Sequence, residues 1–357
     1  MVIGAEGRPH ARRWIAVARA YGTPDARRSV LQLVTTSLPL IAIWFLMQLN
    51  LHYGVGYWAT LLLSVPAAGL LVRMFMIQHD CGHGSFFRSR WLNDMVGRVI
   101  GVFTLTPYDH WRNAHAYHHA SAGNLDRRGI GDIDVLTVAE YRALPKWRRV
   151  LYRMYRNPLV FFVIGPTYLF VIKHRFPFRS RPEGKRGMAS VLLTNLAIAA
   201  LLAGAIYLFG VSDLLLVQIP ITLIASSIGV WLFFVQHQFE LTYWERSETW
   251  SFEEAALRGS SFYDLPKVLR WFTADIGIHH VHHLYSKIPN YRLRECVDAN
   301  PGLAEVKKLT LWQSLKCMRL TLWDEQQKRL VGFRHVHAER TQDYGRTRSA
   351  GTAPAHP

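Results

Sequence analysis

Four apolar segments of this chain each approach the roughly 20 residues that a helix needs to cross a lipid bilayer. They cover about residues 30–49, 53–76, 189–209 and 213–235. Residues 50–52 join the first two segments and residues 210–212 join the last two, so each pair is expected to form a hairpin. The sequence therefore predicts an all-α integral membrane protein with four transmembrane helices in two hairpins.

Two shorter apolar stretches, residues 96–105 and 159–172, lie between the hairpins. Neither comfortably spans a bilayer, so we expect interfacial or re-entrant segments. These boundaries predict a basic arm at residues 1–29, a membrane domain at residues 30–325 and a polar tail at residues 326–357. The tail is polar and charged, with much Gly, Pro and Ala from about His335 onwards, and we expect it to be disordered.

The charge of the chain, formally +17, is concentrated beside the apolar segments. Both hairpin connections lack Lys and Arg, whereas the amino-terminal arm and residues 146–149 and 173–186 are rich in them. The positive-inside rule therefore places both termini and the central loop in the cytoplasm. Basic residues in these places suit anionic lipid headgroups, or an acidic redox protein, better than nucleic acid.

Nine of the seventeen histidines form four clusters with metal-ligand character. Neutral imidazole is a common ligand of iron and other first-row metals, and separations of three or four residues place side chains on one face of a helix. All four clusters fall on the cytoplasmic side of the predicted topology. They read HDCGH (His79, His83), HAYHH (His115, His118, His119), VQHQFE (His237) and HHVHH (His279, His282, His283).

Nine imidazoles are too many for a tetrahedral zinc ion, which takes three or four ligands. They suit two ions of higher coordination number with positions open for dioxygen, and iron is the natural candidate. The alternative is a set of interfacial histidines that cover a polar surface. Four carboxylates near the clusters are candidates to accept hydrogen bonds from the ligand imidazoles, or are ordinary solvated acids: Asp80, Asp109, Glu240 and Asp275.

The residues around the clusters resemble the membrane fatty-acid desaturase superfamily, and bacterial acyl-lipid desaturases of the Δ12/ω-6 type in particular. The similar segments are HDCGHGSFF from His79, HAYHHASAGNLDRRGIGD from His115, VQHQFE at residues 235–240 and HHVHHLYSKIPNYRL at residues 279–293. The resemblance implies a non-haem di-iron centre held by all nine histidines named above. Asp275 departs from the pattern, because similar bacterial sequences tend to have Asn there, and a carboxylate at this position could bind or tune iron.

The resemblance implies an oxygen-dependent desaturase that inserts a cis double bond into a lipid-linked acyl chain, in a bacterial inner membrane. Removing hydrogen from an unactivated methylene needs a metal–oxygen oxidant, for which a protein supplies ligands and a pocket that excludes water. Two electrons would come from a separate donor, for which ferredoxin is expected, because no electron-carrying domain is evident in the sequence.

Two other functions use the same residue types. A membrane hydroxylase or ketolase of alkanes, sterols or carotenoids would insert oxygen at a similar centre, and its product would gain sixteen mass units where a desaturase product loses two. A non-enzymatic metal transporter would favour ionisable residues at bilayer depth. The four apolar segments contain almost none until their ends, which disfavours transport.

Overall fold

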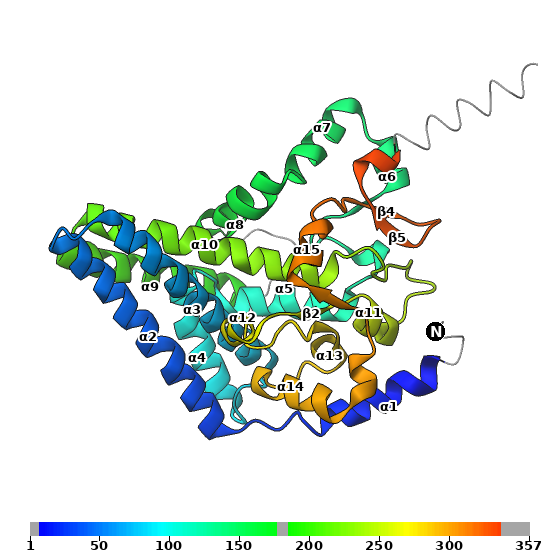
Figure 1. The fold of residues 1–357 in the computed structure, drawn as a ribbon, viewed down its shortest axis with the longest axis horizontal. Helices are drawn as coiled ribbons and strands as arrows, with labels where there is room; N and C mark the ends of the chain where they lie inside the picture. Colours follow the sequence, from blue (N-terminus) through cyan, green and yellow to red (C-terminus); the bar gives the residue numbers. More distant parts are fainter. Residues whose placement is uncertain (1–6, 177–184, 337–357) are drawn as a thin grey trace, which may run out of the picture.

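The computed structural model describes residues 7–176 and 185–336, and it is mostly helical, as predicted. Four helices are long and apolar enough to cross a membrane: α2 (Ala26–His52), α3 (Tyr57–His83), α9 (Lys185–Phe209) and α10 (Val211–His237). They correspond to the four predicted segments. Helices α2, α9 and α10 extend theirs by up to four residues at an end, whereas α3 begins four residues later and ends seven residues later than predicted. Figure 1 shows these helices on one side of the molecule and a mixed cap on the other.

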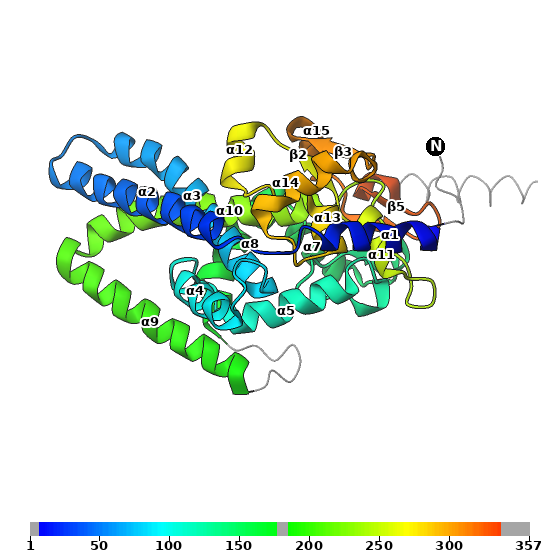
Figure 2. The ribbon, with the colours of Figure 1, turned by 90° about the horizontal axis from the view of Figure 1, so that it is seen from below.

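Glycines in the left-handed region of backbone space make the two hairpin turns. Gly54 (φ 65°) and Gly56 (φ 134°) lie between α2 and α3, and Gly210 (φ 80°) alone separates α9 from α10. Residues with a Cβ rarely adopt such angles. Both turns lie at the end of the bundle that is farthest from the cap, as the two views agree (Figures 1 and 2).

Helix α3 is the central span of the bundle. It is the most buried of the four, whereas α2 and α9 expose most of their apolar side chains, as helices that face lipid do. A Cβ on Gly69 would lie 2.7 Å from the ring of Phe272, so this glycine lets the cap helix α12 (Lys267–Phe272) approach α3 closely. At its end, Gly84 adopts φ 63° and stops α3 directly after His83.

The two shorter apolar stretches form helices that do not cross the bundle as simple spans. Helix α4 (Arg90–Phe103) buries Asn93, Gly97 and Ile100 on one side and exposes apolar side chains on the other. Helix α7 (Lys146–Tyr155) bends by 60° into a helical run over Val160–Arg175, and this bent pair counts as a fifth candidate span only if it is taken as one element. The run comprises η2 (Val160–Ile164), α8 (Gly165–Thr167), η3 (Tyr168–Ile172) and η4 (Lys173–Arg175).

The cap consists of short helices and five short strands, and the strands were not predicted from the sequence. Strand β4 pairs in parallel with β1 and antiparallel with β5, and β2 pairs in parallel with β3. The strands are β1 (Leu136–Thr137), β2 (Phe262–Asp264), β3 (Lys308–Thr310), β4 (Leu322–Asp324) and β5 (Arg329–Val331). The remaining helices are α1 (Gly7–Arg19), α5 (Tyr108–Ser121), α6 (Val138–Ala143), α11 (Phe252–Arg258), α13 (His279–Leu284), α14 (Asn290–Ala299) and α15 (Leu311–Cys317), with single turns η1 (Leu125–Arg127) and η5 (Pro301–Ala304).

The packed structure continues beyond the domain boundary expected at residue 325. Strand β5 completes the β1–β4–β5 sheet, and Leu330, Val331 and Val336 are buried against the cap. Because these apolar side chains have a core to enter, residues 326–336 belong to the folded domain and not to the predicted tail. The rest of that tail, residues 337–357, lies outside the described residues.

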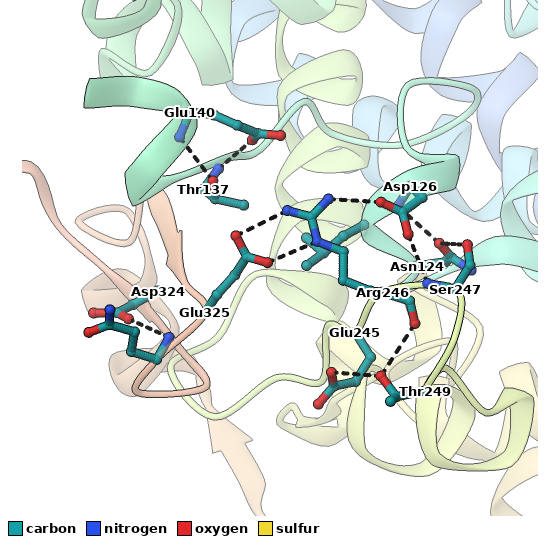
Figure 3. Close-up of polar contacts among 12 residues, drawn as sticks. Asn124, Asp126, Thr137, Glu140, Glu245, Arg246, Ser247, Thr249, Asp324 and Glu325 are labelled. Atoms are coloured by element: carbon teal, nitrogen blue, oxygen red, sulfur yellow. Dashed lines mark hydrogen bonds and ion pairs between the residues drawn. The ribbon is translucent and has the colours of Figure 1, made fainter. Parts of the chain in front are cut away.

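An arginine connects three separate segments of the cap (Figure 3). Arg246 donates from Nη1 to Asp126 at 2.8 Å and from Nε to Glu325 at 2.9 Å. Ser247 adds a backbone hydrogen bond of 2.8 Å to the same Asp126. These contacts attach the long loop after α5 to the turn that follows β4.

Candidate metal centre

All nine predicted histidines lie together where the membrane helices meet the cap. His79 and His83 occupy the last turns of α3, and His237 is the last residue of α10. The other six come from α5 and α13. The ends of two spans and two cap helices, which are far apart in the sequence, therefore supply one site.

Packing against neighbouring segments holds α13 in position, because a six-residue helix is too short to be stable alone. Its Val281 and Leu284 are buried in a cluster with Ile288 and Leu293. His280 points away from the other histidines and its Nε2 lies 2.8 Å from the carbonyl of Leu303. This contact ties α13 to the segment after α14 and leaves the remaining three histidines of the box facing the site.

An aromatic contact positions α5 against α3. The ring of Trp111 on α5 meets the ring of Phe75 on α3 edge to face, with centroids 5.3 Å apart. A Cβ on Gly82 would lie 3.0 Å from the Trp111 ring, so the glycine within HDCGH allows this approach. Gln78 of α3 donates a hydrogen bond of 3.2 Å to the carbonyl of Thr106, and this contact holds the segment that leads into α5.

The histidines separate into two groups, and within each group the potential ligand atoms all lie within 4.8 Å of one another. The five-histidine group contains His79, His83, His115, His119 and His282, and the four-histidine group contains His118, His237, His279 and His283. Two of the sequence boxes are divided between the groups. Because His118 lies about 100° around α5 from His119, it belongs to a different group from its neighbour.

Distances between imidazole nitrogens fit coordination to a shared metal ion. The Nε2 atom of His237 lies 3.1 Å from that of His118 and 3.0 Å from that of His279. In the other group the Nε2 atoms of His115 and His83 are 3.1 Å apart. Two neighbouring ligands on an octahedral ion, each at about 2.1 Å, would be about 3.0 Å apart. The donor atoms are therefore already spaced as the edges of two coordination shells.

Burial keeps five histidines of the cap neutral. The pKa values of His115, His119, His279, His282 and His283 lie well below the ordinary 6.5, first because burial disfavours the charged ring and second because the neighbouring imidazoles would repel it. A neutral imidazole retains a lone pair for a metal. His83 and His115 of the five-histidine group remain partly accessible, whereas all four members of the other group are buried.

Three acceptors contact the opposite ring nitrogens of these histidines. His79 Nδ1 lies 3.2 Å from Asp80 Oδ1, and Oδ2 of the same carboxylate accepts from the backbone and side chain of Asn290 at 2.7 and 2.8 Å. His237 Nδ1 lies 3.3 Å from the carbonyl of Gly259. His118 Nδ1 contacts Asp132 in a short, buried pair. Such partners orient a metal-ligating ring and set which nitrogen carries its proton.

Asp132 was not among the carboxylates proposed from the sequence, although it closes the motif that begins at His115. It is buried on the loop after α5. Gly131 (φ 71°) lets this loop approach α5 closely, because a Cβ there would lie 2.7 Å from the carbonyl of Ala114. Spacing could not indicate the contact, since Asp132 lies fourteen positions after His118 and beyond the end of α5.

The other three proposed carboxylates pair with arginines instead of ligand histidines. Asp109 pairs with Arg98 at 2.9 Å and Glu240 with Arg329 at 3.4 Å. Asp275 pairs with Arg270 at 2.8 Å and belongs to neither histidine group. Its backbone adopts φ 52°, a conformation that Asn and Asp tolerate better than most residues, so a turn explains this position.

A cavity of about 900 Å³ begins at the histidines and extends between the membrane helices. His79 and His115 of the five-histidine group and His279 of the four-histidine group line it. The walls beyond them are mainly apolar and aromatic and come from α3, α10 and the bent run after α7, including Phe75, Phe161, Leu169, Leu232 and Phe233. Polar side chains, among them Asn113, Asp134 and Lys173, lie at another part of the lining.

Comparisons with known proteins agree with this geometry. A family model described as fatty acid desaturase matches residues 56–314. The chain is 47% identical over 317 residues to a fatty acid desaturase of Bacillus subtilis, with 89% of each chain covered. It is 33% identical over 268 residues to an sn-1 acyl-lipid omega-3 desaturase (ferredoxin) of Synechocystis sp., covering 68% of each chain. An sn-1 oleoyl-lipid 12-desaturase of the same organism is 30% identical over 229 residues, covering 63% of each chain.

Proposed function

This chain belongs to the fatty acid desaturase family, and we propose that it inserts a cis double bond into a lipid-linked acyl chain. The reaction would use a dinuclear iron centre, dioxygen and two external electrons. Two hydrogens leave adjacent carbons of the chain and, with two further electrons and two protons, reduce one dioxygen to two waters. The observation that carries the proposal is the apolar cavity that reaches both histidine groups.

The walls of the cavity suit an acyl chain and little else of comparable size. An unactivated methylene offers no hydrogen-bonding group, so only close apolar packing can hold it beside a reactive centre. Phe75, Leu232 and Phe233 provide such contacts near the histidines. The same walls exclude water from the reacting carbons, which protects the centre from side reactions.

The nine histidines are the residues that would hold iron, which supplies the oxidising power, with dioxygen, to remove hydrogen from a methylene. The nitrogen separations of 3.0 to 3.1 Å support this assignment. Asp80, Asp132 and the carbonyl of Gly259 would hold three of the rings in position. The protein's own part in the chemistry is thus to position ligands and substrate.

Electrons would arrive from a separate, acidic protein such as a ferredoxin. Within residues 7–176 and 185–336, no other group of three or more His, Cys, Asp or Glu side chains is placed to hold a metal ion. The net charge of +17 favours an acidic partner. The Synechocystis relative named above carries ferredoxin in its description.

We place the termini and the metal site on the cytoplasmic side of the membrane. Both hairpin turns lie opposite the cap and lack Lys and Arg, which supports this orientation (Figure 1). Protease treatment of intact and opened spheroplasts that carry terminal tags tests it. Tags cleaved only after opening are expected, and cleavage in intact spheroplasts would contradict the orientation.

The decisive experiment is expression in a host with a simple lipid profile, followed by mass spectrometry of its fatty acids. A new acyl chain two mass units lighter is expected, and fragmentation would locate its double bond. A product sixteen mass units heavier would identify a hydroxylase instead. Purified enzyme should require a reductant, and full turnover with dioxygen alone would contradict the need for an external donor.

A further inference from the structure

A second pocket, separate from the catalytic cavity, lies where α2, α4 and α14 begin near one another. It has a volume of about 600 Å³. The link before α2, the loop between α3 and α4 and the first turn of α14 supply its walls. Arg28, Arg88 and Arg292 line it together with the apolar side chains of Phe87 and Leu92.

Positive charge predominates in this pocket, which three arginines and one carboxylate line. Asp25 accepts hydrogen bonds from the first amides of α2, and Glu295 pairs with both Arg28 and Arg292. Arg88 is exposed and makes no hydrogen bond or ion pair with the described residues. Since each guanidinium has five N–H donors, most of those around the pocket remain available to a ligand.

Both helices beside the pocket change from arginine to exposed apolar side chains within a few residues. Arg28 of α2 is followed by Leu31, which is 63% exposed, and Arg90 of α4 by Trp91, which is 66% exposed. Arginine and tryptophan next to lipid-facing side chains are typical of the depth at which phospholipid headgroups lie. The pocket is therefore placed at the level of lipid phosphates.

The apolar surface below the pocket continues along α4. Met95, Val99 and Phe103 are exposed on the same helix at intervals of four residues, so they form one stripe with Trp91. Phe103, at the far end of this stripe, also lines the catalytic cavity. A soluble anion would gain nothing from this stripe, whereas the acyl chains of a lipid could pack along it.

From the arginines and the adjoining apolar stripe we infer that this pocket binds the phosphate of an anionic phospholipid, with its acyl chains against α4. Arg28, Arg88 and Arg292 supply charge-assisted hydrogen bonds to the phosphate oxygens. The bound lipid would lie along α4, and Phe103 at the end of this helix lines the catalytic cavity. Lipid binding at this site does not depend on the proposed desaturation reaction.

Isothermal titration calorimetry of the full-length protein in detergent tests this site. The probes are dioctanoyl phosphatidylglycerol, dioctanoyl phosphatidylcholine and inorganic phosphate. Tighter binding of the anionic lipid than of either other probe is expected. Removing one arginine near a lipid surface weakens binding roughly fivefold, so Arg88→Gln should lose about that factor and Arg88→Gln with Arg292→Gln roughly 25-fold.

Matched variants separate this site from general charge effects. Arg148→Gln removes an exposed arginine beside Trp147 on α7, outside the pocket, and should leave the affinity unchanged. Arg88→Lys keeps the charge and should retain most of the binding. Equal affinity in Arg88→Gln and the unaltered protein would overturn the inference, as would equally tight binding of inorganic phosphate or phosphatidylcholine. Because binding is measured without turnover, failure of the proposed reaction would leave this result intact.

Discussion

The two histidine groups differ in burial and in the elements that supply them. The five-histidine group is built on α3, α5 and α13, and its members His83 and His115 remain partly accessible. The four-histidine group is built on α5, α10 and α13 and is wholly buried. On an ion of higher coordination number, the group with fewer histidines leaves more positions for other ligands. The two ions that we propose would therefore lie in unequal surroundings beside one cavity.

Loss of a histidine from either group should have the largest effect. We expect His119→Ala and His283→Ala each to abolish desaturation, because both ions are needed. This loss is well beyond the roughly 10- to 100-fold that is typical when a group that hydrogen-bonds a metal ligand is removed. Product analysis and iron content measure the outcome. His280→Gln is the control, since His280 belongs to the same box but contacts Leu303. A fully active His119→Ala or His283→Ala enzyme would show that the groups are not equally required.

Removal of the buried carboxylate should weaken the four-histidine group selectively. Asp132→Asn keeps the shape of the side chain but removes the negative charge that accepts a hydrogen bond from His118. The iron affinity of this group alone should therefore fall by about 10- to 100-fold. Iron titration monitored by absorption spectroscopy resolves the two ions. Asp109→Asn is the control, because Asp109 pairs with Arg98. Equal weakening at both groups would refute a local role for Asp132.

Narrowing the cavity tests whether both groups serve one substrate. Gly229 lines the cavity, and a Cβ added there would meet no atom within 4 Å. We expect Gly229→Leu to fold and to disfavour longer acyl chains by about tenfold, since a pocket discriminates one methylene by about 10-fold or more. Competition between acyl chains of two lengths measures the ratio. Gly204→Leu on α9 is the control, because its Cβ is equally free but lies outside the cavity lining.

A chelator should distinguish the groups by accessibility, with the smallest effect of the four. The partly accessible five-histidine group should release iron first and the buried group several times more slowly, because a chelator must reach the ion or wait for local opening. Release to a coloured chelator, followed over time, should therefore show two phases. A single phase that removes both ions would mean that burial does not control their exchange.

Local sequence patterns were sufficient for the four spans and for the set of histidines. Apolar length predicts a membrane helix because bilayer thickness and helical rise are constants. The same reasoning was weaker for residues 326–336, whose polar composition concealed the three apolar side chains that enter the cap. It also gave no sign of the short strands, since each depends on a partner elsewhere in the chain.

The sequence by itself determined which residues could bind metal and that they would gather at the membrane surface. Only the tertiary structure decided how they are shared, placing His118 with His237 and His119 with His282. In the structure, three of the four proposed carboxylates pair with arginines and not with ligand histidines, whereas Asp132 contacts His118. The reason is physical: spacing along a helix sets the direction of a side chain, whereas its partner is set by the packing of segments that are distant in the chain.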